Sequence, residues 1–316
     1  APDLASRVYC LARQEDWPAA ATTLEAGRAL GEIPAGTADV LARFLEPELA
    51  EDEALAPPSP MTPLIWRVME AAGDPLPSQN LPLAYAQADL RANTGWKARI
   101  EAGERLARSG ALAPNALHGL YTERAPAASG GVWDRAKAVG DLDEALEEAE
   151  RGETEHLTLI LPQVWAKMSE AELEVPLAEI YGARLAPLKL ADPAGALAHR
   201  IALLGPDPAA VATAAPREPF GDALARGNLR GIVPPDRMSG AVRDAFRPNA
   251  APIELTAMLA GGRRGEAVLQ ALLRLAAGAG GDLRAVTEGL ATLRAAGLEM
   301  PARQIGLELV ILDRRG

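Results

Sequence analysis

Apolar residues recur along this chain at the spacing of an α-helix rather than at that of a β-strand. Within residues 3–14, Leu4, Val8 and Leu11 fall on one helical face. Residues 264–277 and 283–296 repeat the pattern with Val268, Leu269, Leu272, Leu273, Leu275, Leu283, Val286, Leu290 and Leu293. Period-two alternation of β-branched or aromatic residues is missing, and the nearest run, 157–161, lies between helical flanks. The pattern predicts an all-α protein in which 157–161 is buried helix.

Helix starts are marked by a capping residue with a proline close behind it. Asp16 precedes Pro18, and Thr62 precedes Pro63, as expected for a side-chain cap with proline in the first turn. Similar signals, including capping boxes, predict further starts at Asp141, Ser169, Asp192, Asp207, Asp282 and Pro301. In this interpretation, the helix that opens at Trp133 ends at Gly140.

Small side chains dominate the apolar part of the composition. Hydrophobic residues make up 48% of the 316 residues, yet only 4% of the chain is aromatic. Alanine, which leads the rest, is the strongest helix former and allows helices to approach closely. The 26 prolines and 29 glycines mark frequent turns, because both residues are disfavoured inside helices. We therefore expect many short helices in close packing.

Changes in composition divide the chain into five segments. Helical hairpins are predicted over 1–50, central helical repeats over 62–204 and further hairpins over 251–316. Residues 51–61 are acidic and proline-rich, which is typical of a linker or a surface loop. Residues 205–250 hold seven prolines and predict a loop-rich elbow.

Two segments of the chain are similar to each other. Each has an acidic turn and then apolar or small residues at helical spacing: Asp16, Trp17, Leu24 and Gly27 in one, and Asp141, Leu142, Ala149 and Gly152 in the other. Trp66, Trp96, Trp133 and Trp165 are also separated by 30 to 37 residues. These features resemble the tetratricopeptide repeat, a helix-turn-helix unit of about 34 residues.

The resemblance implies antiparallel helix hairpins stacked as a solenoid-like superhelix, whose concave face holds a peptide or a protein. The alternative fold is a non-repetitive helical bundle in which the similar turns arose independently. Both alternatives are predominantly α-helical.

Charge and apolar runs exclude some classes of partner. The net charge of −11 argues against a nucleic-acid partner, because such proteins usually carry a basic patch. The sequence contains no run of about 18 apolar residues, so no membrane span is predicted.

Cys10, the one cysteine, lies in an apolar stretch and is predicted to be a buried core thiol. The start at Ala1 without Met fits removal of a signal peptide or a trimmed terminus, so we expect the periplasm ahead of the cytoplasm.

Catalytic and cofactor-binding motifs are missing from the sequence. It holds no phosphate-binding loop, no zinc-binding His-Glu-x-x-His helix and no nucleophile elbow. His118, His156 and His199 are far apart in the sequence, and we interpret each as a surface or helix-flank residue. We therefore predict no catalytic residue, no cofactor and no metal, and a protein that is not an enzyme.

Four residues are candidates for binding a partner. Trp96 and Arg99, and likewise Trp133 and Arg135, place an aromatic ring beside a cation in polar surroundings. Tryptophan and arginine are enriched at the centres of protein interfaces. We expect a non-enzymatic helical scaffold that binds a protein or peptide, with a bacterial envelope or motility assembly as its setting. The alternative is a helical accessory domain of a cell-wall-acting enzyme.

Overall fold

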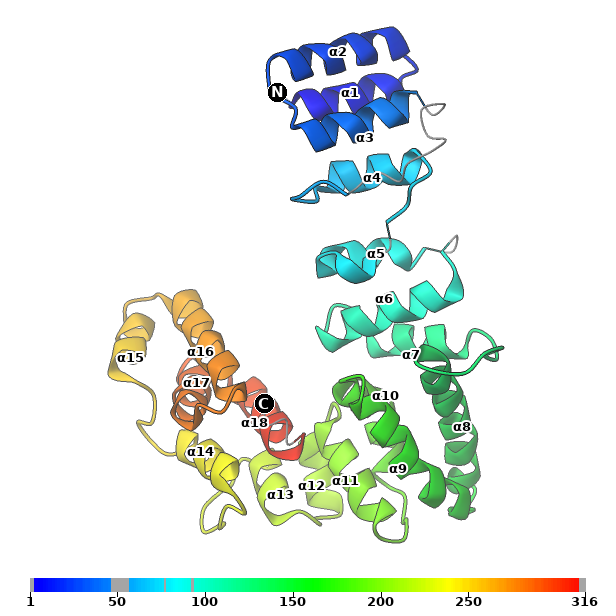
Figure 1. Cartoon of the computed structure of the whole chain (residues 1–316). Coiled ribbons are helices and arrows are strands. Elements are labelled where there is room, and N and C mark those ends of the chain that lie inside the picture. Colours follow the sequence, from blue (N-terminus) through cyan, green and yellow to red (C-terminus); the bar gives the residue numbers. More distant parts are fainter. Residues whose placement is uncertain (1–2, 47–56, 77, 92–93, 313–316) are drawn as a thin grey trace. The chain divides into compact units, whose positions relative to one another are not determined.

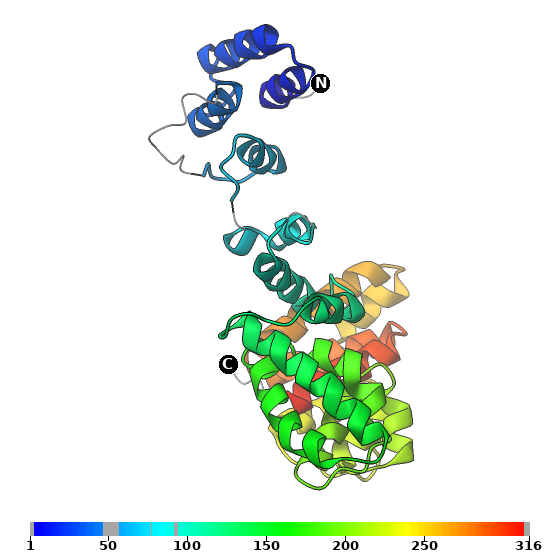
Figure 2. The ribbon, with the colours of Figure 1, turned by 90° about the vertical axis from the view of Figure 1, so that its right-hand side faces the viewer.

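The computed structural model describes residues 3–46, 57–76, 78–91 and 94–312, and these residues form helices and connecting loops without a β-strand (Figure 1). This confirms the all-α prediction. Contacts between Cα atoms divide the chain into two compact units, Ala1–Arg105 and Leu106–Gly316. The second unit is drawn from green to red in Figures 1 and 2.

The first unit contains short helices and two 3₁₀ turns. They are α1 (Leu4–Arg13), α2 (Trp17–Ala29), α3 (Ala35–Leu45), α4 (Pro63–Ala71), η2 (Ser78–Asn80), η3 (Leu83–Tyr85), α5 (Ala86–Asp89) and α6 (Trp96–Arg108), which crosses the boundary. Between residues 81 and 91 the helical structure is limited to η3 and the single turn of α5. Of the predicted linker 51–61, residues 51–56 lie outside the described residues, and 57–61 form no helix.

The second unit contains the remaining helices. They are α7 (Pro114–Thr122), α8 (Val132–Glu150), α9 (Glu155–Ser169), α10 (Glu174–Leu185), α11 (Ala194–Leu204), α12 (Pro208–Ala214), α13 (Pro219–Ala225), α14 (Arg237–Ala245), α15 (Ile253–Ala260), α16 (Arg264–Ala279), α17 (Leu283–Ala295) and α18 (Glu299–Ile311). The predicted elbow over 205–250 therefore contains three short helices, α12 to α14. The run 157–161 is helical, as predicted, but it is only partly buried, because Leu157 and Leu161 face the core while Leu159 is exposed.

Several predicted caps are confirmed by hydrogen bonds. The side chain of Asp16 accepts from the backbone N–H of Ala19, and Asp207 accepts from that of Ala210. Thr62 caps α4 in the same way, and Asp282 caps α17. Each cap satisfies a backbone donor that the first helical turn leaves without a partner.

The predicted helix break at Gly140 is wrong. Helix α8 continues through Gly140 and Asp141 as far as Glu150. A glycine costs a helix about 1 kcal/mol relative to alanine, whereas burying one leucine contributes about 1.5–3 kcal/mol. Leu142 and Leu146 are both fully buried after the glycine, so the buried face outweighs the local signal. Asp141 therefore lies within a helix and does not form the acidic turn assigned to it in the repeat comparison.

The predicted cap at Ser169 is also wrong, because Ser169 is the last residue of α9 and α10 begins five residues later. The last helix begins at Glu299, which places Pro301 inside its first turn rather than at its start.

The predicted close approach of helices occurs between α10 and α11. A Cβ atom added to Gly182 would lie 3.3 Å from the Cα atoms of both Ala202 and Gly205, and 3.4 Å from the carbonyl oxygen of Ile201. These neighbours are backbone atoms, which cannot rotate away. A Cβ atom at this position would push the neighbouring backbone away by a few tenths of an ångström, so small residues set the spacing of this helix pair.

Helices that follow each other in the chain pack together through much of the second unit, including α8 with α9, α10 with α11 and α16 with α17. Helix α18 packs against α17, which precedes it, and also against α11 and α13, which come much earlier in the chain (Figures 1 and 2). The amide of Gln304 in α18 donates to the carbonyl oxygen of Leu204 at 3.0 Å. The C-terminal half of this unit therefore closes on itself around one core.

Candidate interaction surface

Three leucines on α16 are exposed to solvent. Leu269, Leu272 and Leu273 have 57%, 46% and 58% of their surface exposed. Their spacing of i, i+3 and i+4 places them on one side of the helix. We call these three residues the leucine face.

The leucine face is exposed because α16 packs into the core through its opposite side. Ala267, Ala271, Leu275 and Gly278 are buried there. Gly278 and Gly289 permit tight packing on α17, since a Cβ atom on Gly289 would lie 2.7 Å from Cγ of Leu275. In the described part of the chain, α16 packs closely against α15 and α17, and no helix covers the leucine face.

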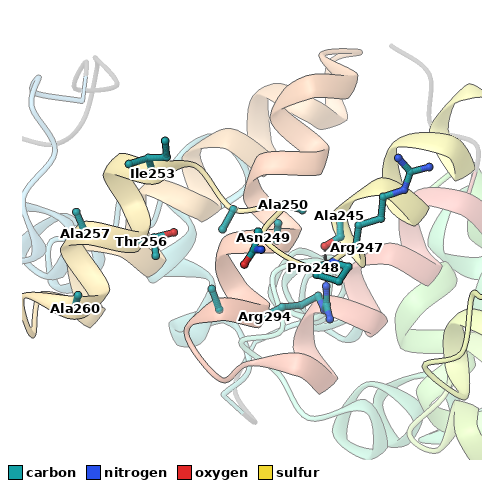
Figure 3. Close-up of a pocket in the computed structure, with 13 residues that line it drawn as sticks. Ala245, Arg247, Pro248, Asn249, Ala250, Ile253, Thr256, Ala257, Ala260 and Arg294 are labelled. Carbon is teal, nitrogen blue, oxygen red and sulfur yellow. Dashed lines mark hydrogen bonds between the residues drawn. The ribbon is translucent and has the colours of Figure 1, made fainter.

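A groove of about 590 Å³ lies next to this region of the second unit. Figure 3 shows side chains of α15 along one side, among them Ile253, Thr256 and Ala257. The other side is formed by the loop after α14 and by the end of α17, with Asn249 and Arg294. Most of the lining is apolar, and alanines account for seven of its thirteen residues.

Arg294 is fixed in place at one end of the groove. Its guanidinium donates to the carbonyl oxygen of Ala245 at 2.8 Å and to the carboxylate of Glu299 at 2.9 Å. It also lies 4.5 Å from the ring centroid of Phe246, which is close enough for a cation–π contact. Arg247, also in the lining, lies 3.2 Å from the carboxylate of Asp244 and has 62% of its side chain exposed.

The four predicted partner-binding residues lie elsewhere. Trp96 is buried, with 8% of its surface exposed, so its ring forms part of the packing of α6. Arg99 lies on the same helix and is half-buried, as are Trp133 and Arg135 on α8. The two pairs belong to different units, and their role in binding stays a prediction.

In the sequence, the exposed leucines of α16 form part of a helical pattern that does not by itself mark them as surface residues. One signal could have separated them from core residues. At about 100° per residue, the five large apolar residues from Val268 to Leu275 spread over about 160° of the helix circumference, while the small residues Ala267, Ala271 and Gly278 share a separate stripe. A stripe of small residues marks the side on which another helix packs closely.

The prediction that every histidine is a surface or helix-flank residue is wrong for His199, which lies buried in the middle of α11. Only 5% of its surface is exposed, and its Nε2 lies 2.8 Å from Oδ1 of Asp222, which is 1% exposed. The other oxygen of Asp222 accepts the backbone N–H groups of Arg217 and Glu218 at 2.7 and 2.8 Å. This pair therefore joins α11 to the start of α13, beside a cavity of about 250 Å³.

The remaining histidines are half-exposed, as predicted. His118 lies 2.8 Å from the carboxylate of Asp143, which also accepts the hydroxyl of Tyr181 at 2.9 Å. Burial and the charge of Asp143 raise the pKa of Tyr181 far above its usual value, so this hydroxyl stays protonated and donates. His156 lies 2.8 Å from Glu148. Cys10 is exposed rather than buried, because the core side of α1 is formed by Val8 and Ala12.

A cell-wall-acting enzyme would be indicated by a carboxyl group in a cleft with a raised pKa. Desolvation raises the pKa of Glu179, but that side chain lies on the exposed side of α10. Among the described residues, no group of three or more His, Cys, Asp or Glu side chains is placed to hold a metal ion. The same residues include no helix that is both long enough and apolar enough to cross a membrane.

Comparisons with protein-family models, with curated proteins and with solved structures give no match.

Proposed function

We propose that this protein is a non-enzymatic helical scaffold that binds a protein or peptide partner through the C-terminal part of its second unit. The observation that carries the proposal is the leucine face. Exposed single leucines are ordinary, but three neighbouring leucines on one side of a well-formed helix are typical of an interaction site.

Covering this face would contribute part of the binding energy that recognition requires. Complete burial of a leucine contributes about 1.5–3 kcal/mol. Because each of the three side chains is about half exposed, covering all three would contribute about 2–4 kcal/mol. That amount corresponds to one strong hot spot in a protein interface.

A solenoid-like arrangement of helix hairpins is part of the proposal for helices α7 to α12. Its support is the packing of neighbouring helices in that stretch, together with the tetratricopeptide-like spacing of the sequence. Beyond α12 the return of α18 favours a closed bundle. Binding is proposed at this bundle rather than on a concave solenoid face.

The proposal is tested by affinity capture with the purified chain and two variants. Leu272→Glu places a charge on the leucine face, and Leu159→Glu places the same charge on an exposed leucine of α9. We expect one protein to be captured at near-stoichiometric yield by the wild type and by Leu159→Glu, and lost with Leu272→Glu. Equal capture by both variants, or capture of nothing by the wild type, would contradict the proposal.

A further inference from the structure

We propose that the groove between α15 and the end of α17 binds a peptide segment that carries large apolar side chains and a carboxylate. The inference rests on the proposed function, in that it assigns a chemistry to the partner. It concerns a different surface from the leucine face, so the two can fail separately.

The shape of the groove favours large side chains in the ligand. Ala257 and Ala260 on α15 face it from one side, and Ala291 and Ala295 on α17 from the other. These short side chains leave a volume of about 590 Å³, within the range of sites that enclose a small ligand or several side chains. Ile253, with 87% of its surface exposed at the rim, gains burial when the groove is filled.

The charge at one end of the groove favours an acidic ligand. Asp244 is shared by Arg243 and Arg247, and Glu299 is shared by Arg294 and Arg303. The lining itself contains the guanidinium groups of Arg247 and Arg294 and no carboxylate, which places two positive charges at this groove. The C-terminal ends of α14 and α17 together offset about one of them, since each helix end carries about half a negative charge.

This local excess contrasts with the chain as a whole, whose net charge is −11. An acidic peptide would therefore experience net repulsion from the chain as a whole and local attraction from Arg247 and Arg294 at this groove. Arg247 is the exposed member of the set, and a carboxylate bound there would form a charge-assisted, two-point contact.

Asn249 supplies a group that suits a peptide backbone. It lies in the loop over the middle of the groove, with a left-handed backbone at φ 55° that asparagine tolerates well (Figure 3). Within the described residues, its side-chain amide has no hydrogen-bond partner. The amide therefore offers one donor and one acceptor to a peptide bond.

The experiment is a selection of binders from an unbiased library of random 12-residue peptides displayed on phage, with the full chain as the target. Enriched peptides are then synthesised, and their affinities are measured by fluorescence anisotropy. Two variants test the groove: Arg247→Glu reverses the charge, and Ala257→Phe fills the space. Arg230→Glu and Ala183→Phe make the same changes at exposed positions outside the groove and serve as matched controls.

We expect enriched peptides to combine Asp or Glu with large apolar residues. Arg247→Glu and Ala257→Phe should each weaken their binding at least tenfold, while both controls leave it unchanged. Basic or uncharged peptides, or no enrichment, would overturn the groove proposal. Peptides lost with Leu272→Glu but not with the groove variants would also overturn it, while supporting the leucine face and hence the proposed function.

Discussion

Helices α11 and α16 are built from similar residues but have opposite environments. Eight of the eleven residues of α11 are buried, whereas only four of the sixteen residues of α16 are. Helix α11 packs against α9, α10, α12, α13 and α18, while α16 packs against α15 and α17. Both helices are rich in alanine and leucine, and the number of helices that meet at each one helps to decide whether its leucines belong to a core or to a surface.

The largest effect is expected at the buried pair that anchors α11. Asp222→Ala leaves His199 and two backbone N–H groups without their acceptor, which should cost about 3–5 kcal/mol. Urea denaturation followed by circular dichroism measures this loss. Asp143→Ala is the comparison, because Asp143 also bonds a histidine but is more exposed; its loss should be about 1–2 kcal/mol. Equal losses would contradict the role of burial.

A second test forces α10 and α11 apart. Gly182→Leu introduces a side chain where a Cβ atom would already lie 3.3 Å from backbone atoms of Ala202 and Gly205. We expect destabilisation of about 3 kcal/mol, at the upper end of the usual cost of overpacking. Ala183→Leu, one residue on and exposed, should change stability by less than about 0.5 kcal/mol in the same denaturation experiment.

A third test compares two leucines of α16 directly. Leu275, with 8% of its surface exposed, packs on α17, and its replacement by alanine should cost about 2–3 kcal/mol. Leu272→Ala on the leucine face should leave thermal stability nearly unchanged. If both substitutions destabilised the protein alike, the leucine face would be part of the core.

The smallest effect concerns pH. Burial alone would raise the pKa of Glu288, but hydrogen bonds from Arg284 and Arg274 outweigh it, and the pKa lies below its usual value. Because the folded pKa is lowered, this stabilisation is complete at neutral pH and is lost as the pH falls through the folded pKa. Glu288→Gln should therefore lower the free energy of unfolding at pH 7 by less than about 1 kcal/mol, which is measured as a slightly lower Tm. The Tm difference from the wild type should narrow near pH 3, and a constant difference would contradict the assignment.

The helical class and many helix boundaries could be predicted from the sequence because their causes are local. Asp16, Thr62 and Asp207 each cap a helix with a side chain only three residues from the N–H that it accepts. The break predicted at Gly140 was wrong because the cause that keeps α8 helical there is not local. There the deciding energy comes from leucines buried against other helices, and a local signal does not report them.

The candidate surface could not be located in the same way. The exposure of Leu272 depends on how the other helices pack around α16, which the sequence of α16 does not contain. The pairing of His199 with Asp222 likewise joins residues 23 positions apart, beyond the reach of local patterns. The tryptophan and arginine residues chosen from the sequence were selected by residue type. Burial of Trp96 shows how little residue type says about exposure in a chain whose helices pack through small residues.

The return of α18 has a consequence for the order in which the second unit folds during synthesis. Gly306 lies against Leu224 and Val242, and Gln304 reaches a carbonyl group one hundred residues earlier. As the chain leaves the ribosome, α11 to α14 emerge well before α18. The apolar side chains that α18 covers therefore stay exposed to solvent until α18 has been synthesised. Closure of this long loop then completes the core in a late, non-local step, which is the kind of step that slows folding.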